Sequence, residues 1–338
     1  MNSAHPRSPT PYVSVIIPAH NEERHIAKCL DSVLKTGWPR EMLELLVIDH
    51  SSTDRTAKLA QAAGARVLSL STGKIGSVRN AGLAAAKGQF VAYVDGDCTV
   101  PATWLQAAIG LLQSDQSIGA VGGPCLSPAD GTWVERSIAP SAIDSGFARR
   151  VKAIATSSFI ARTSLLRDIG AFDETLISGE DDDMSNRIRS RGLALVSTSD
   201  CHIVHHGYPQ TWQDMLKKEI WHGSHHIEVR TEFDLTLLLT FLFLLASMAA
   251  PVLLVIAALS RGPESFYPLG VSLILQLVPP SLLAAKRVRQ SPRDWRLIPQ
   301  LLAVGYAYFT GHSVGVLANL WRSATSHLQR RATTGPNS

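Results

Sequence analysis

An uninterrupted apolar stretch divides this chain into two parts of different character. Residues Leu235–Ser260 contain no charged side chain over 26 positions, which as a helix would measure about 39 Å. A hydrocarbon core about 30 Å thick needs roughly 20 apolar residues, so this stretch predicts a membrane-spanning helix. Before about residue 230, charged and apolar residues are mixed as they are in soluble domains. We therefore expect a soluble domain followed by a membrane-embedded region.

Two further apolar stretches follow the first. Phe266–Ala285 is about long enough to span a bilayer, and Pro279 and Pro280 are expected to break or kink its end. Leu297–Leu320 carries several polar residues, among them His312, so the sequence leaves open whether it spans the membrane or re-enters from one side. We predict two or three membrane helices in this part of the chain.

The loop between these two stretches is strongly basic. Residues 286–296 contain five lysine or arginine residues and one acid, Asp294. Because cytoplasmic loops carry an excess of basic residues, we expect the loop and the amino-terminal domain in the cytoplasm, with a multi-pass anchor in the cytoplasmic (inner) membrane. The polar residues 1–11 lack the apolar core of a cleavable signal peptide. The net charge of +4 is small, and its basic excess near the apolar stretches indicates contact with anionic lipids and no nucleic-acid partner.

Short β-branched runs alternate with longer amphipathic ones from Tyr12 to Gly123. This alternation favours an α/β fold with a mostly parallel sheet and flanking helices. The expected strands are 12–18, 45–49, 66–70, 89–95, 118–122, 153–160 and 194–197, and the expected helices are 23–35, 53–63, 76–87, 101–113 and 182–191. The predicted regions are a flexible terminus at 1–11, a soluble domain at 12–233, a membrane region at 234–322 and a polar tail at 323–338.

Two acids separated by a glycine directly follow the apolar run Phe90–Val94. Residues two apart on a strand point to the same side, so Asp95 and Asp97 can meet at the carboxyl end of that strand, where open parallel sheets bind ligands. Two hard oxygen donors at this edge suit Mg²⁺ or Mn²⁺, with a diphosphate supplying further ligands. For the tripeptide alone, a surface turn with solvated acids is the alternative.

Other polar groups are expected at the same edge of the sheet. Pro18–Glu23 follows the first strand, Asp49–Asp54 follows the second, and Arg79-Asn80 opens the helix before the Asp95 strand. Each group alone has an ordinary explanation, such as a helix cap or a solvated charge. Their shared position at one edge favours a binding site.

A second acidic cluster, Glu180–Asp183, lies at the start of the helix that ends near Gly192. Acids at a helix amino terminus stabilise the helix dipole, which is the purely structural explanation. Four consecutive carboxylates exceed that need, and their mutual repulsion raises some of their pKa values. A raised carboxylate pKa is what a general base near neutral pH requires, so the cluster favours a catalytic role.

These motifs occur together, and in the same order, as in family 2 glycosyltransferases, which the chain resembles from about Tyr12 to Arg230. The residues that carry the resemblance are Val15–Glu23, Val47–Asp54, Arg79–Gly82, Asp95–Asp97 and Gly179–Asp181. The resemblance implies a GT-A fold that binds a nucleotide-diphosphate sugar, by default a UDP-sugar, and inverts its anomeric carbon. It also implies donor contacts from Pro18, Asn21, Glu22, Asp49, Arg79 and Asp95, a Mg²⁺ or Mn²⁺ site at Asp97, Asp95 and His205, and Asp181 as general base.

The chain also departs from the family pattern. It lacks the Gln-x-x-Arg-Trp motif of processive members, and His50 stands where many relatives have a second acid, which leaves base preference open. The expected function is metal-dependent transfer of one sugar to a hydroxyl of a lipid-linked or envelope glycan acceptor. A polyprenyl-phosphate sugar synthase is one alternative, but its ionised acceptor needs no base, so the Glu180-Asp181 pair favours a hydroxyl. A catalytically silent membrane scaffold of an envelope polysaccharide system is the other, and the full set of carboxylates argues against it.

Overall fold

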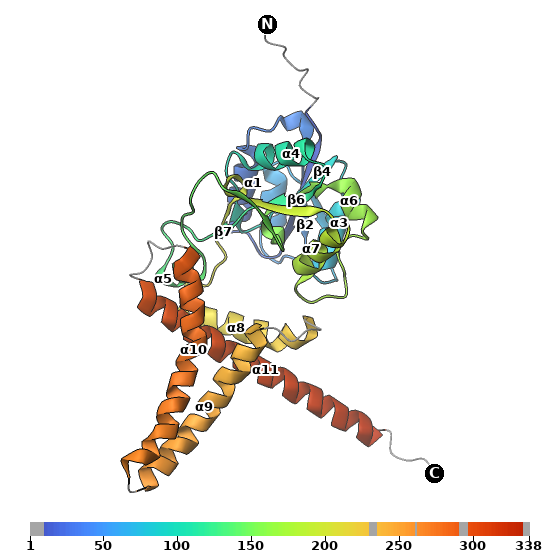
Figure 1. The fold of residues 1–338 in the computed structure, drawn as a ribbon. Coiled ribbons are helices and arrows are strands. Elements are labelled where there is room, and N and C mark those ends of the chain that lie inside the picture. The colour runs from blue at the N-terminus through green and yellow to red at the C-terminus, as the bar shows by residue number, and fades with distance from the viewer. Residues whose placement is uncertain (1–9, 230–234, 261, 291–296, 334–338) are drawn as a thin grey trace. The chain divides into compact units, whose positions relative to one another are not determined.

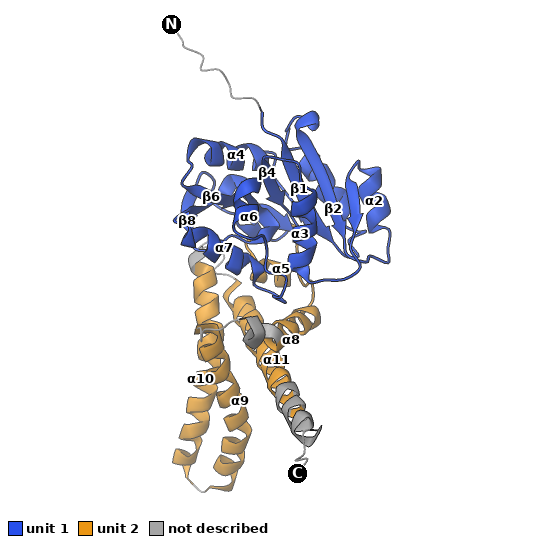
Figure 2. Cartoon of the chain, turned by 90° about the vertical axis from the view of Figure 1, so that its right-hand side faces the viewer, with its two compact units in different colours: residues 1–129, 141–207 blue, residues 130–140, 208–338 orange. Residues whose placement is uncertain are grey.

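A computed structural model describes residues 10–229, 235–260, 262–290 and 297–333 (Figure 1). The chain forms two compact units: unit 1 comprises residues 1–129 and 141–207, and unit 2 comprises residues 130–140 and 208–338 (Figure 2). The predicted domain boundary at 233 lies outside the described residues. So do most of the predicted flexible terminus, the basic loop from residue 291 to 296 and the last five residues of the predicted tail.

An eight-stranded sheet forms the centre of unit 1, in the order β3-β2-β1-β4-β9-β6-β10-β8. Its strands are β1 Val13–Ala19, β2 Leu43–Asp49, β3 Arg66–Ser69, β4 Phe90–Tyr93, β6 Ile118–Gly122, β8 Ala148–Val151, β9 Phe159–Arg162 and β10 Ala194–Thr198. Strands β1 to β4 are parallel to their neighbours in this half of the sheet, whereas β9 runs antiparallel to β4 and β6, and β8 antiparallel to β10. The mostly parallel α/β sheet predicted from the sequence is confirmed.

The prediction of one strand at 153–160 is wrong in its boundaries. The structure has β8 before this segment and β9 at its end, separated by a 3-10 turn at Thr156–Ser158. This turn is held by the Ser158 hydroxyl, which donates a hydrogen bond to the Cys201 carbonyl at 2.7 Å. Further 3-10 turns lie at Arg40–Met42, Ser199–Cys201 and Pro263–Phe266.

Helices cover both faces of the large sheet. One face is packed by α1 Ile26–Leu34, α2 Thr56–Ala62 and α4 Trp104–Ser114, and the other by α3 Ile75–Ala85, α6 Thr163–Asp168 and α7 Glu180–Ser190. The central strand β1 is buried along its whole length because its alternate residues face opposite layers. Val15 and Ile17 belong to the first core, and Ile16 belongs to the second.

A second, three-stranded sheet lies beside the large one, in the order β5-β11-β7. Its strands are very short: β5 Cys98–Thr99, β7 Cys125–Leu126 and β11 Ile203–His205. Strand β11 runs antiparallel to β5, and His205 is the register partner of Cys98. This pairing brings a residue from near the end of unit 1 next to the acids that follow β4.

All regular elements in the described residues of unit 2 are helices. Unit 2 contains α5 Trp133–Ile138, α8 Trp212–Val229, α9 Leu235–Leu259, α10 Tyr267–Gln290 and α11 Ile298–Thr333. Helices α9 and α10 lie side by side and are joined at one end by a short connection (Figures 1 and 2). Three segments are long and apolar enough to cross a membrane: Leu235–Leu259, Pro263–Val288 and Ile298–Trp321. Helix α10 continues through Pro279 and Pro280, so of the expected break or kink the break does not occur.

Close contact between α8 and α11 depends on glycines. A Cβ atom at Gly315 would lie 2.2 Å from the Ile220 carbonyl oxygen, and one at Gly223 would lie 2.2 Å from the His312 carbonyl oxygen. Gly311 likewise faces α8, where its Cβ would meet the side chain of Glu219 at 2.8 Å. Gly311 and Gly315 therefore act as the small residues that let two helix backbones approach closely.

Candidate active site

A cleft of about 340 Å³ opens at the carboxyl ends of strands β1, β2 and β4 in unit 1. Three neighbouring parallel strands end here, so the loops that follow them share one edge of the sheet. The lining residues come from these loops, from helix α3 and from strand β11: Pro18, Ala19, His20, Glu22, His50, Ile75, Val78, Arg79, Asp95, Gly96, Asp97 and His205. Five predicted donor or metal residues, together with His205, therefore line one cleft.

The loops after β1 and β2 are tied together by side-chain to backbone hydrogen bonds. The Asn21 side-chain oxygen accepts a hydrogen bond from the Thr53 amide at 2.8 Å, and the Thr56 hydroxyl accepts one from the Glu22 amide at 2.7 Å. Asn21 has a positive φ of 57°, a left-handed conformation that asparagine tolerates better than most residues. Asn21, predicted to contact the donor, thus shapes the loop that presents its neighbours to the cleft.

Arg79 is a buried cation that joins two acidic groups. Its guanidinium lies 3.3 Å from the Asp95 carboxylate and also donates a hydrogen bond to Glu180, the first residue of α7. Gly82, one turn later on α3, allows this placement because a Cβ there would lie 2.3 Å from the Ile16 side chain of β1. The link connects the end of β4 to the start of α7. Sequence reasoning did not assign Glu180 a role of its own.

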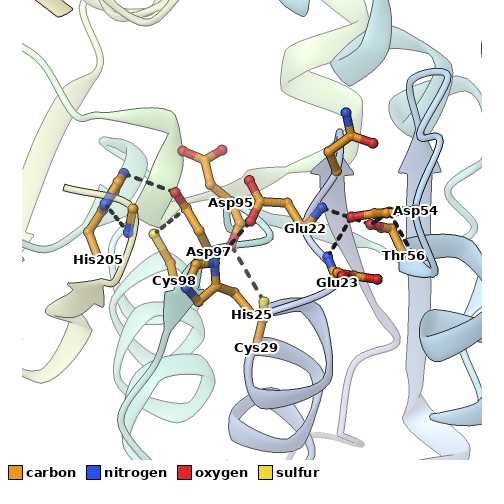
Figure 3. A network of polar contacts seen from close by, with 12 residues as sticks. Glu22, Glu23, His25, Cys29, Asp54, Thr56, Asp95, Asp97, Cys98 and His205 are labelled. Carbon is orange, nitrogen blue, oxygen red and sulfur yellow. Dashed lines mark hydrogen bonds and ion pairs between the residues drawn. The ribbon is translucent and has the colours of Figure 1, made fainter. Parts of the chain in front are cut away.

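Asp97 and His205 are neighbours in the lining of the cleft, with 3.5 Å between the imidazole Nε2 and the carboxylate (Figure 3). The Cys98 sulfur lies within the same cluster, where it donates a hydrogen bond to Asp97 at 3.5 Å. Burial raises the pKa of the Cys98 thiol far above its usual range. The remaining oxygen and nitrogen donors form a set that suits Mn²⁺ or Mg²⁺.

Gly207 lets the turn after β11 approach this pair. A Cβ atom at this position would lie 2.0 Å from the Asp97 carboxylate and 3.1 Å from the His205 ring. The Gly207 amide also donates a hydrogen bond to the imidazole Nδ1 of His205 at 3.1 Å, which fixes Nε2 as the atom facing Asp97. Sequence reasoning missed Gly207, although a glycine two residues after a candidate ligand is a usable signal.

Three carboxyl groups line the cleft, and burial raises the pKa of two of them, Glu22 and Asp95. The pKa of Glu22 is raised by burial first and then by the charge of Asp97, although a hydrogen bond from His25 at 3.1 Å opposes the shift. Burial also raises the pKa of Asp95, against the opposing charge of Arg79. Three carboxylates thus share a small space with few cations, an arrangement that a divalent cation would stabilise.

Two further predicted site residues, Asp49 and Asp181, lie at the end of β2 and at the start of α7. Asp49 ends β2 and is 6% exposed, and within the described part of the chain its Oδ1 has no hydrogen-bond partner. Asp181 lies in the first turn of α7, where burial and then the neighbouring charge of Glu180 raise its pKa to about 6. Both acids lie outside the lining of the cleft itself, and Asp181 is connected to it through Glu180 and Arg79.

The sequence is similar to those of several known proteins. Residues 14–170 match the family model described as Glycosyl transferase family 2. Glycosyltransferase AglE of Haloferax volcanii is 31% identical over 232 residues, which cover 66% of this chain and 75% of that protein. Pre-mycofactocin glycosyltransferase of Mycobacterium tuberculosis is 27% identical over 241 residues, covering 65% of this chain but only 49% of that protein.

The fold has a solved counterpart. Mannosyltransferase PcManGT from Pyrobaculum calidifontis, solved in complex with GDP-Man and Mn²⁺, superposes with a TM-score of 0.57 at 17% identity, covering 92% of this chain and 88% of that one. Unit 1 therefore has the GT-A fold, and the apolar helices of unit 2 fit a membrane anchor. The chain belongs to glycosyl transferase family 2 and is a nucleotide-sugar-dependent glycosyltransferase.

Proposed function

We propose that this protein transfers one sugar from a nucleotide-diphosphate donor to a hydroxyl of a lipid-linked or envelope glycan acceptor, with inversion at the anomeric carbon. The buried Arg79 carries this proposal, because it contacts Asp95 on the donor side and Glu180 beside Asp181. The Arg79 guanidinium thereby connects Asp95, an expected donor-binding residue, to Glu180, the neighbour of the expected base Asp181.

Asp97 and His205, with Asp95 beside them, would hold a Mg²⁺ or Mn²⁺ ion. The fit rests on the donor set, since a carboxylate and an imidazole face each other in a cleft with excess negative charge. PcManGT, with the same fold, was solved with Mn²⁺. When bound, such an ion neutralises the charge that develops on the diphosphate leaving group.

Asp181 acts as the general base in this proposal. Its pKa of about 6 leaves it ionised at neutral pH, yet basic enough to accept a proton from an acceptor hydroxyl. As that proton moves to Asp181, the acceptor oxygen forms a bond to the anomeric carbon and the bond to the diphosphate breaks. A single displacement of this kind inverts the anomeric centre. The nucleoside diphosphate leaves with the bonding electrons.

The nucleotide itself is assigned to the edge formed by Pro18, Glu22 and Asp49. The partnerless and buried Oδ1 of Asp49 is suited to accept a hydrogen bond from the base or ribose of the donor. UDP remains the default nucleotide from the family resemblance, and GDP enters the test because PcManGT was solved with GDP-Man.

Unit 2 would anchor the protein in the cytoplasmic membrane, with unit 1 in the cytoplasm. The five lysine and arginine residues of segment 286–296 support this orientation. A membrane anchor places the enzyme where amphiphilic acceptors are found, which supports a lipid-linked acceptor.

The test is release of nucleoside diphosphate by the detergent-solubilised full chain, with UDP- and GDP-sugars and with Mn²⁺ or Mg²⁺. We expect slow release from one donor that requires metal and falls about 10²–10³-fold in Asp97→Asn. Asp31→Asn is the matched control, because Asp31 is an exposed acid that pairs with Lys35 on α1. Metal-independent release, or full release in Asp97→Asn, would contradict the proposed site. No release and no thermal stabilisation by any nucleotide would favour the scaffold.

A further inference from the structure

A second pocket, of about 290 Å³, lies wholly within unit 2. Its walls come from α5, α8, α10 and α11, which are four separate segments of the chain. Much of the surface is apolar, with Met215, Leu301 and Val304 all at most 5% exposed and Tyr308 beside them. A pocket with such walls is suited to an aliphatic chain.

The polar side of the pocket carries two cations and one acid. Lys286 and Arg287, on the last turns of α10, supply the cations, and Lys286 is exposed. Glu219 of α8 supplies the acid; it is 5% exposed and lies 3.3 Å from the imidazole of His222. The lining therefore has an excess of positive charge next to an apolar wall, a combination that recognises an amphiphilic anion.

The ends of the helices place this pocket at the level of a membrane surface. Lys286 and Arg287 lie at the end of a segment long and apolar enough to cross a bilayer, Pro263–Val288. Trp133 of α5 and Trp221 of α8 are 37% and 47% exposed, and exposed tryptophans are enriched at membrane–water interfaces. Cations in that position meet the phosphates of lipids.

We propose that this pocket binds the terminal phosphate and first chain segment of a single-chain lipid phosphate, such as a polyprenyl phosphate or diphosphate. A phosphomonoester or diphosphate carries about two negative charges and can engage both Lys286 and Arg287, whereas a phospholipid diester carries one. Glu219, the acid of the lining, lies against His222. The apolar wall takes the adjoining chain. That this lipid carries the glycan acceptor rests on the proposed transferase function and applies to the diphosphate, which keeps two negative charges when a glycan is attached to its outer phosphate. The lipid site itself does not rest on the proposed function.

The probe is farnesyl phosphate, and its binding to the detergent-solubilised full chain is followed by tryptophan fluorescence without any nucleotide sugar. We expect farnesyl phosphate to bind and Lys286→Gln to weaken it about tenfold, as loss of one charge-assisted contact does. Lys217→Gln is the matched control, because Lys217 is an exposed lysine of α8 that pairs with Asp214 outside the pocket. It should bind like the wild type.

A second variant tests the apolar part. Ala284 is 5% exposed and lines the pocket, so Ala284→Phe should fill the space and abolish binding while thermal unfolding shows that the helices remain folded. Farnesol and inorganic phosphate, offered separately, should each compete at least tenfold less well than farnesyl phosphate. Tight binding of farnesol, no effect of Lys286→Gln, or equal competition by phosphatidylglycerol would each overturn the proposal.

The two proposals can fail separately. If farnesyl phosphate binds as expected but no sugar nucleotide is cleaved, the lipid site stands and the transferase proposal fails. If a donor is cleaved but farnesyl phosphate does not bind, the transferase stands and the lipid site is wrong.

Discussion

The cleft of unit 1 and the pocket of unit 2 are built by different means. The cleft consists of loops that follow adjacent strands, cross-linked by polar contacts such as Asn21 to Thr53 and Arg79 to Asp95. The pocket lies between helices that approach through glycines and apolar side chains. Polar contacts therefore set the arrangement of the loops at the cleft of unit 1. The arrangement of the helices around the pocket of unit 2 depends on how closely their backbones can approach.

This difference predicts which substitutions reduce activity and which reduce stability in each region. Removing a charge from the cleft should abolish chemistry and leave the fold intact, because the sheet and its two cores do not depend on that charge. Adding one methyl group between α8 and α11 should disturb the helical unit and leave nucleotide binding unchanged. The predictions below test this contrast, beginning with the largest effect.

The largest effect is expected for Asp181→Asn. Loss of the proposed base should slow sugar transfer to a hydroxyl acceptor by about 10²–10⁴-fold, because a positioned carboxylate contributes that much to catalysis. Nucleotide binding should be unchanged, and the wild-type rate should rise with pH to a plateau above about 6 as Asp181 loses its proton. Acceptor transfer and nucleotide titration on the same preparation measure both. Full activity in this variant would favour the polyprenyl-phosphate sugar synthase instead.

The converse effect is expected in unit 2 for Gly315→Ala. The new Cβ would lie 2.2 Å from the Ile220 carbonyl and 2.6 Å from the Ser224 amide, and neither backbone atom can move without shifting α8. Such overpacking costs about 1–3 kcal/mol, so thermal unfolding in detergent should occur at a lower temperature while nucleotide affinity is retained. Gly270→Ala on α10 has no atom within 4 Å of the new Cβ and is the control. If both variants unfold at the same temperature, the stability of unit 2 does not depend on the close approach of α8 and α11.

The sequence predicted unit 1 better than the pocket for a physical reason. The acids Asp95 and Asp97 follow a strand whose apolar run is visible in the sequence, and parallel strands present their ends at one edge. The structure accordingly brings Pro18, Glu22, Arg79 and both acids together at one cleft. The roles assigned to these residues, and to Asp49 and Asp181, remain predictions.

Features that depend on distant pairing were not predictable. Strands β5 and β11 are too short to show a period of two, so the approach of His205 to Asp97 could be proposed only from the family resemblance. Helix α5 occurs between strands of unit 1 in sequence but belongs to unit 2, which no local pattern reveals. The pocket of unit 2 needs that helix, and so it appears only in the folded chain.

A smaller effect, confined to the cleft, is expected for Gly207→Ala. The added methyl group would occupy the space 2.0 Å from the Asp97 carboxylate and force it to turn away from His205. Because the obstructed atom is the end of a short side chain, we expect little loss of stability but about tenfold weaker Mn²⁺ affinity, similar to the loss of a supporting group at a metal site. Gly110→Ala, on α4 with open space around its Cβ, is the control. A Mn²⁺ titration that does not distinguish the two variants would place the metal elsewhere.

The last effect concerns the stability of the fold alone and follows from the raised pKa of Asp181. Folding raises this pKa from 3.8 to about 6, so the native state binds the proton more tightly than the unfolded chain. The resulting stabilisation is complete below about pH 4 and is lost as pH rises through 6. Asn cannot ionise, so Asp181→Asn should match the wild type near pH 4 and exceed it by up to about 3 kcal/mol at pH 8, because each unit of pKa shift corresponds to about 1.4 kcal/mol. The difference is measured as a higher Tm of the variant at pH 8. A variant that is inactive yet more stable at pH 8 would show that the first turn of α7 keeps an energetically unfavourable charge that the reaction requires. Identical Tm differences at both pH values would mean that Asp181 titrates normally and would remove the support that its pKa gives to the proposed base.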